Sequence, residues 1–201
     1  MLNLRPAVGR IVGPLAAGLL RVGVTPDMVT VAGTIGAVAG AFALIARGSF
    51  FWGGVVVTIA VLSDALDGAM ARLRGISGPW GAFLDSTLDR IADASIFAAL
   101  VLWYAGDGDS SLLLAVALFC LVAGVVTSYA KARAEGLGMT CNVGIAERTE
   151  RLIAVLAGVI LYGVGAHVAL PIALWVLAVA SAVTVGQRLA EVHRQATAQA
   201  G

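Results

Sequence analysis

Four aspartates stand at spacings that could build one metal site. Asp64 and Asp67 are three residues apart and Asp85 and Asp89 are four apart, so each pair would lie on one face of a helix. The connection between the two helices, residues 73–80, is short and contains glycine and proline. Such a connection favours antiparallel neighbours, and we therefore expect the four carboxylates to converge.

Converging carboxylates need positive charge, because they repel one another strongly in surroundings of low dielectric. Arg72 could supply one charge, whereas two divalent cations would balance all four acids. Ligands that are all oxygen favour Mg²⁺, Mn²⁺ or Ca²⁺ over zinc. The alternative is that the acids are solvated helix ends paired with nearby arginines such as Arg74 and Arg90. For Asp93 we leave open a salt bridge or a role in supporting the metal ligands.

The segments that carry these acids have the composition of membrane helices. Apolar residues make up 60% of the 201 positions, charged residues 12%, and the formal net charge is +1; the mean hydropathy is +0.95. A disordered or fibrous chain is excluded by this composition. The apolar runs cover residues 28–46, 48–63, 94–106 extended back to about 81, 110–130, and 152–187 folded back near 163–171.

The predicted fold is an all-α integral membrane protein with six transmembrane helices, preceded by an interfacial amphipathic helix in residues 1–22. Residues 1–201 form one membrane domain in this interpretation, with the six-helix core at 27–190. A signal peptide is the competing interpretation of the first residues, but Arg21 interrupts the apolar stretch and no small-residue cleavage site follows. Thr25 or Asp27 could cap the first span, and Pro26 suits its first turn.

Basic residues fix the expected orientation. Three alternate loops, near Arg47, Asp107 and His167, hold one arginine between them, whereas the other twelve basic residues lie at the opposite ends of the spans. Because positively charged short loops stay in the cytoplasm, both termini and the aspartates should face it.

The aspartate segment resembles the CDP-alcohol phosphotransferases, integral membrane enzymes of phospholipid synthesis. Their signature, D-x2-D-G-x2-A-R-x8-G-x3-D-x3-D, matches residues 64–89 at every fixed position and every gap. The resemblance implies transfer of a substituted phosphate from a CDP-linked donor to an alcohol, with release of CMP. It also implies a homodimer.

The same resemblance assigns roles to residues. Asp64, Asp67, Asp85 and Asp89 would bind two Mg²⁺ ions per active site, with Mn²⁺ possible, and Asp89 would also be the general base. The donor, CDP-diacylglycerol, would lie against two groups of residues: the start of the first span, Asp27, Met28, Val29 and Thr30, and the signature positions Gly68, Ala71 and Arg72 together with Gly78.

A basic cluster points to the acceptor. Lys131, the only lysine, lies one helical turn beyond Ser128, and an acceptor with its own phosphate would need such cations. Residues 128–135 and 147–151 resemble the actinobacterial branch of the family that makes phosphatidylinositol phosphate from inositol 1-phosphate. This resemblance would place the acceptor phosphate on Ser128, Lys131, Arg133, Arg151 and Arg188, and it leaves Arg148, His167 and His193 without a role.

Two other functions are compatible with parts of the sequence. Phosphatidylglycerophosphate synthesis uses the same chemistry with glycerol 3-phosphate as acceptor. A divalent-cation transporter would also carry intramembrane acids, but it would need them near the bilayer midplane with access from both sides. We expect membrane lipids as partners, no nucleic acid, and the plasma membrane of a bacterium as the location.

Overall fold

The computed structural model describes residues 5–75 and 78–200, and its regular elements over these residues are all helices. Eight α-helices and one short 3-10 helix follow in the order α1 (Arg5–Arg21), α2 (Pro26–Ala43), η1 (Ile45–Arg47), α3 (Phe50–Leu62), α4 (Asp64–Arg74), α5 (Pro79–Ala105), α6 (Ser111–Glu135), α7 (Arg148–Gly163) and α8 (Ala169–Ala200). This confirms the all-helical prediction for the part of the chain that is described.

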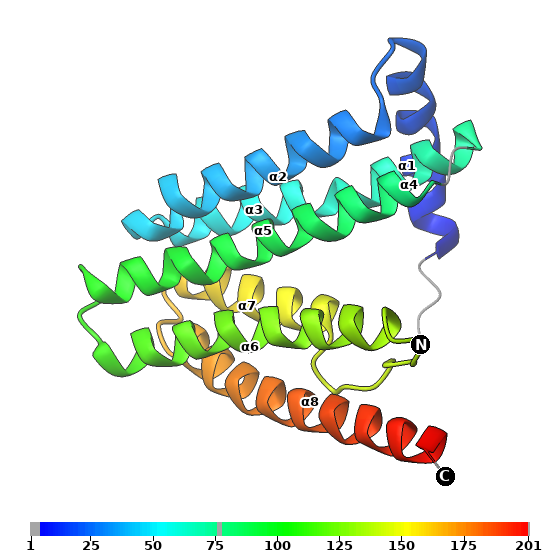
Figure 1. Cartoon of the computed structure of the whole chain (residues 1–201). Coiled ribbons are helices and arrows are strands. Elements are labelled where there is room, and N and C mark those ends of the chain that lie inside the picture. The colour runs from blue at the N-terminus through cyan, green and yellow to red at the C-terminus, as the bar shows by residue number, and fades with distance from the viewer. Residues whose placement is uncertain (1–4, 76–77, 201) are drawn as a thin grey trace.

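Six long helices form a closed ring. Each of them packs against two others, in the cyclic order α2, α3, α7, α8, α6, α5 and back to α2. Figure 1 shows the helices running roughly side by side, with the starts of α2, α5 and α7 at the same end as the C-terminus. The loops after α2, α5 and α7 lie at the other end.

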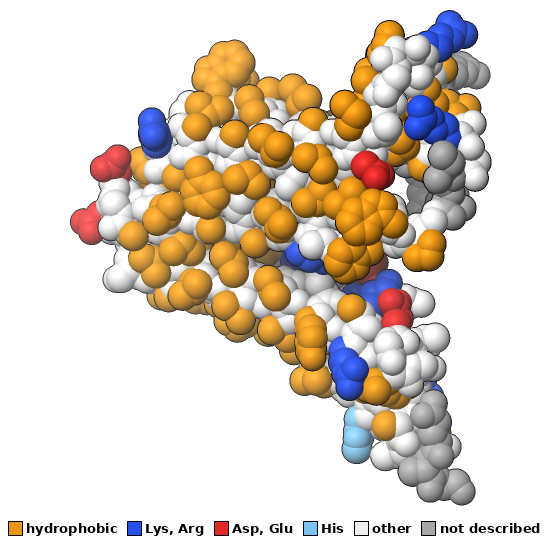
Figure 2. All heavy atoms as spheres, turned by 45° about the horizontal axis from the view of Figure 1, so that its top comes forward, with side chains coloured by type: hydrophobic (Ala, Val, Ile, Leu, Met, Phe, Trp, Pro, Cys, Tyr) orange, Lys and Arg blue, Asp and Glu red, His pale blue; other side chains and the backbone are white. Residues whose placement is uncertain are grey.

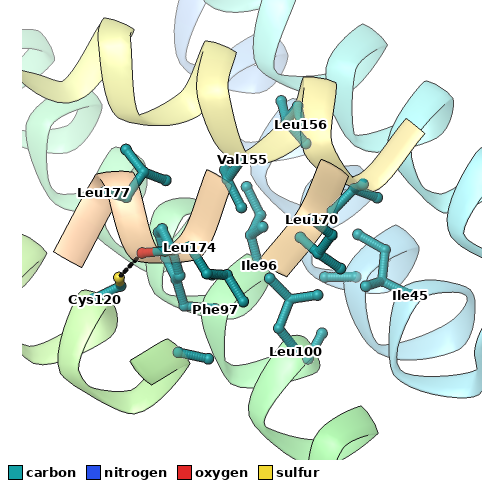
Figure 3. Packing of buried hydrophobic residues seen from close by; sticks show 14 of the residues in the cluster. Ile45, Ile96, Phe97, Leu100, Cys120, Val155, Leu156, Leu170, Leu174 and Leu177 are labelled. Carbon is teal, nitrogen blue, oxygen red and sulfur yellow. Dashed lines mark hydrogen bonds between the residues drawn. The ribbon is translucent and has the colours of Figure 1, made fainter. Parts of the chain in front are cut away.

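The core of the ring is apolar. Buried side chains from all six of its helices meet there, as Figure 3 shows for Ile96, Leu100, Val155 and Leu174 among others. The Cys120 thiol lies 3.5 Å from the Leu174 carbonyl oxygen. This packing joins α5, α6, α7 and α8 in one unit.

Glycines let neighbouring helices approach closely. A Cβ atom added to Gly54 on α3 would stand 2.5 Å from a side-chain carbon of Ile160 on α7. One added to Gly158 on α7 would stand 2.9 Å from Ala173 Cβ on α8. Any side chain at these two positions would push neighbouring helices apart.

Among the described residues, four helical segments are long and apolar enough to cross a membrane: Pro26–Arg47, Phe50–Arg74, Ser111–Glu135 and Ala169–Ala198. In Figure 2 apolar side chains cover the flank of the molecule and charged ones gather toward its two ends. The structure therefore supports a membrane protein with four such segments. Six spans stay a prediction, because α5 carries several charges in its first half and α7 has only 16 residues.

The helix α1 runs across one end of the ring, where it packs against α4 (Figure 1). A helix is thus present where a surface helix was predicted, although residues 1–4 lie outside the described part. Its position at a membrane surface remains a prediction.

Candidate metal and substrate site

The four aspartates of the signature come from two helices. Asp64 and Asp67 belong to the first turn of α4, where the positive end of the helix dipole favours carboxylates. Asp85 and Asp89 are one turn apart on α5. Asp67 is buried, and the side chain of Asp89 is 12% exposed.

The two helices meet through α2. Thr30 on α2 donates a hydrogen bond to Asp67 Oδ2 on α4 (2.6 Å), and the Trp80 indole on α5 donates to Asp27 Oδ2 (3.2 Å). The main packing of α4 is with α1 and α2, and that of α5 is with α2 and α6. The expected direct pairing of α4 with α5 thus gives way to pairing through α2, because the start of α2 packs beside both helices.

Arg148, the first residue of α7, links the acids of α4 and α5. Its NH2 nitrogen lies 2.7 Å from Asp89 Oδ1 and 3.3 Å from Asp64 Oδ2. Its Nε lies 3.3 Å from Asp93 Oδ1. Asp64 from α4 and Asp89 from α5 therefore approach one nitrogen, so the structure brings one carboxylate of each pair together.

The carboxylate oxygens suit a hard divalent cation as ligands, although the side chains are not arranged around a common ion position. Over residues 5–75 and 78–200, no three Asp, Glu, His or Cys side chains are grouped closely enough to hold an ion as they stand. The positive charge of Arg148 instead lies between Asp64 and Asp89. A place that attracts a guanidinium and offers only carboxylate oxygens fits Mg²⁺ or Mn²⁺.

The predicted donor-binding residues surround the same end of α4. Thr30 is buried and Asp27 and Val29 are half-buried at the start of α2, while Met28 is exposed. Thr25 caps this helix, its hydroxyl accepting from the Met28 backbone N–H at 3.2 Å, as predicted.

The remaining donor-binding positions are open to a ligand. Gly68 and Ala71 are half-buried on α4, and Arg72 and Gly78 are exposed. A Cβ atom at Gly78 would meet nothing within 4 Å. Space is therefore available beside Gly78, whereas a Cβ atom at Gly68 would stand 3.3 Å from Arg72 NH1.

Two of the predicted acceptor-binding arginines are buried. Arg151 on α7 is 4% exposed and lies 3.6 Å from Asp93 Oδ2. Arg188 on α8 is also 4% exposed and donates to the carbonyl oxygens of Val143 (3.0 Å) and Thr127 (2.6 Å). Arg188 thus also ties α8 to α6 and to the loop before α7.

The other three predicted acceptor residues lie on α6. Ser128 and Lys131 are half-buried, on the side of the helix where Gly124 contacts the Arg151 guanidinium. Arg133 is exposed and lies half a turn away from that side. Ser128 and Lys131 therefore share a helix face with the glycine that contacts Arg151, whereas Arg133 lies on another face.

The residue that joins the site, Arg148, has no role in the resemblance and was not predicted to contact the aspartates. Asp93 is now seen to be buried and ion-paired with both Arg148 and Arg151, which confirms the salt-bridge option. One signal for this pairing was present in the sequence. Arg148 and Arg151 are three residues apart at the start of an apolar run, and Asp89 and Asp93 are four apart on α5, so each pair shares a helix face.

The chain is similar in sequence to proteins of known family. Residues 23–186 match the CDP-alcohol phosphatidyltransferase family. The phosphatidylinositol phosphate synthase of Streptomyces avermitilis is 52% identical over 193 residues, which cover 92% of this chain and 79% of that protein. The protein of the same name from Cutibacterium acnes is 46% identical and covers 96% of this chain and 97% of its own.

Solved structures show the same fold. The crystal structure of Mycobacterium tuberculosis phosphatidylinositol phosphate synthase with CDP-DAG bound has a TM-score of 0.88 and 48% identity, and it covers 91% of this chain and 94% of that one. The structure of the same protein in complex with manganese and citrate has a TM-score of 0.85, 47% identity and coverage of 90% and 88%. Together these matches show that the chain belongs to the CDP-alcohol phosphatidyltransferase family of phospholipid-synthesising membrane enzymes.

Proposed function

We propose that this enzyme transfers the phosphatidyl group of CDP-diacylglycerol to a hydroxyl of inositol 1-phosphate, giving phosphatidylinositol phosphate and CMP. The observation that carries the proposal is the meeting of two kinds of charge at one end of the helix ring. Carboxylates of α4 and α5 lie beside arginines of α7, so a metal-bound nucleotide and an anionic acceptor could be neighbours. The names of relatives 46–52% identical to the chain support the same acceptor.

In this proposal Asp64, Asp67, Asp85 and Asp89 hold two divalent cations. Mg²⁺ is the expected ion, and Mn²⁺ can replace it, since both take carboxylate oxygens. The manganese complex of a solved relative supports a divalent ion in this family. When bound, the cations supply positive charge that stabilises the developing charge on the leaving CMP.

Asp89 takes the proton of the attacking hydroxyl. A bond forms between that oxygen and the phosphorus that carries diacylglycerol, while the bond from this phosphorus to the oxygen of CMP breaks. Support for this role comes from the position of Asp89, which has little exposure and lies on α5 between Asp85 and Asp93, the latter paired with Arg151. A carboxylate there stands between the donor side and the acceptor side.

The start of α2 closes the nucleotide side. Asp27, Met28, Val29 and Thr30 would contact the donor, and the bond from Thr30 to Asp67 fixes this turn against α4. Gly68 and Ala71 would let the nucleotide approach the helix closely, and Arg72, which is exposed, would bind its phosphates. Gly78 would give room where α5 begins.

The acceptor phosphate would bind on the other side of the aspartates. Ser128, Lys131, Arg133, Arg151 and Arg188 are the proposed contacts. The Nε of Arg151 is buried and has no hydrogen-bond partner within the described part of the chain. A buried guanidinium with a spare donor is stabilised by an anion, and a phosphate monoester supplies one.

The proposed setting is a bacterial plasma membrane. Six helices would cross it, with the aspartates and both termini on the cytoplasmic side. The water-soluble acceptor, inositol 1-phosphate, would reach the site from the cytoplasm. Two copies would form a homodimer. The excess of basic residues at the aspartate end supports this orientation.

The test is CMP release by the purified enzyme given CDP-diacylglycerol and Mg²⁺ with one acceptor at a time. We expect turnover with inositol 1-phosphate and none with unphosphorylated inositol. Turnover with glycerol 3-phosphate alone would assign the chain to phosphatidylglycerophosphate synthesis instead. Metal flux into proteoliposomes without any CMP release would contradict the transferase function.

A further inference from the structure

Arg148 lies where a metal ion would need to bind. One nitrogen, NH2, contacts Asp89 at 2.7 Å and Asp64 at 3.3 Å, and both carboxylates are proposed metal ligands. A divalent cation bound to these carboxylates would repel the guanidinium at such distances, since like charges repel strongly. Entry of the ion therefore favours movement of Arg148 away from Asp64 and Asp89.

Asp93 offers a destination for the displaced nitrogen. Its Oδ1 already contacts the Nε of Arg148 at 3.3 Å. Its Oδ2 is buried and has no hydrogen-bond partner among the described residues, the NH2 of Arg151 lying 3.6 Å away. Nε and NH2 are the two adjacent donors with which arginine binds a carboxylate in a fork.

Arg148 also has room to turn. It begins α7, and its side chain is 27% exposed, whereas the side chain of Asp93 is 10% exposed. Rotation about the Nε contact would carry NH2 from Asp64 and Asp89 to Asp93 without moving the helix. Asp93, the more buried partner, stays in place, while the more exposed Arg148 changes its contacts.

We propose that Arg148 is an exchangeable counter-ion: it balances Asp64 and Asp89 in the metal-free enzyme and withdraws onto Asp93 as a bidentate pair when a divalent cation binds. This inference rests on the proposed metal site. Arg148 and Asp93 act here as positioning residues, since they set how tightly the ion binds without ligating it.

The experiment measures Mn²⁺ binding to the full-length purified chain by the loss of the free-ion electron paramagnetic resonance signal. Arg148→Gln removes the competitor, so Mn²⁺ should bind more tightly, on the order of tenfold, the value of one charged hydrogen bond. Asp93→Asn removes the destination, so binding should weaken. In the double variant the Asp93→Asn effect should largely disappear, because no guanidinium remains to be held.

Arg74→Gln is the matched control, since it removes the same charge from an exposed position on α4. It should change Mn²⁺ affinity little. A second readout is thermal unfolding: metal-free Arg148→Gln should melt below the wild type and gain more from added Mn²⁺.

Two results would overturn the exchange. One is an Arg148→Gln variant that binds Mn²⁺ no more tightly than the wild type. The other is an Asp93→Asn effect on Mn²⁺ affinity that is equally large in the wild type and in Arg148→Gln. Asp93 would then act on the ion through its charge alone, independently of Arg148. A wild type that binds no Mn²⁺ at all would overturn the metal site itself, and Arg148 exchange with it.

Discussion

At the scale of residues, the site depends on opposite charges held close together. The spacing of the aspartates was sufficient to predict which of them share a helix face, because helix geometry places residues three or four apart on one side. Their partner could not be predicted in this way. Arg148 is 84 residues from Asp64 and 55 from Asp93 along the chain, and only the packing of α7 in the ring brings them together.

The first prediction at this scale concerns the proposed base. Asp89→Asn should lower the rate of CMP release by about 10²–10⁴-fold, because an amide cannot take the proton of the acceptor hydroxyl. Mn²⁺ and donor should still bind, since an amide oxygen can ligate the ion. Steady-state rates of CMP release and Mn²⁺ binding, measured on the same variant, check this. Near-normal turnover would assign the role of base to another group.

The second concerns acceptor recognition. Arg151→Ala should raise the apparent KM for inositol 1-phosphate more than it changes kcat, since it removes a cation proposed to bind the phosphate before reaction. Arg194→Ala is the control, because Arg194 is exposed and pairs with Glu191 on its own helix. An unchanged KM for Arg151→Ala would remove this residue from the acceptor pocket.

At the scale of elements, local signals were reliable and long-range contacts were not. The cap at Thr25, the start of α5 near Gly81 and the reversal near residues 163–171 agree with the observed boundaries to within a few residues. Loop 136–147 carried no such signal. It is held by α8, where Thr184, Arg188 and Gln195 contact its backbone, and these partners lie far away in the sequence.

A prediction follows for this loop. Thr184 is fully buried, and its hydroxyl accepts from the Ala146 backbone N–H at 3.0 Å. Thr184→Val should destabilise the fold by about 1–3 kcal/mol, the cost of leaving a buried donor unpaired. Thermal unfolding should show a lower Tm than for the control Thr58→Val, where only a bond within α3 is lost. Equal Tm values would mean that α8 does not stabilise the loop.

At the scale of the whole molecule, the helix ring and α4 place charged groups of α2, α4, α5, α6, α7 and α8 at one end. Composition predicted a membrane protein, yet two of the six ring helices are too charged or too short to be recognised as spans by themselves. The function explains the first of these: α5 carries Asp85, Asp89 and Asp93, which a purely structural membrane helix would exclude.

The proposed orientation can be tested in whole cells. Asp107→Cys in the loop after α5 should react with a membrane-impermeant maleimide applied from outside, because this loop lies at the end opposite the aspartates. His193→Cys near the end of α8 should react only after permeabilisation. The native Cys120 and Cys141 are buried and give the background. The reverse labelling pattern would contradict a cytoplasmic site.

The proposed metal site is tested most directly by anomalous scattering from crystals grown with Mn²⁺ and CDP-diacylglycerol. We expect two anomalous peaks enclosed by Asp64, Asp67, Asp85 and Asp89, with the donor pyrophosphate beside them. A map with the nucleotide in place and no peak among these carboxylates would contradict the metal site.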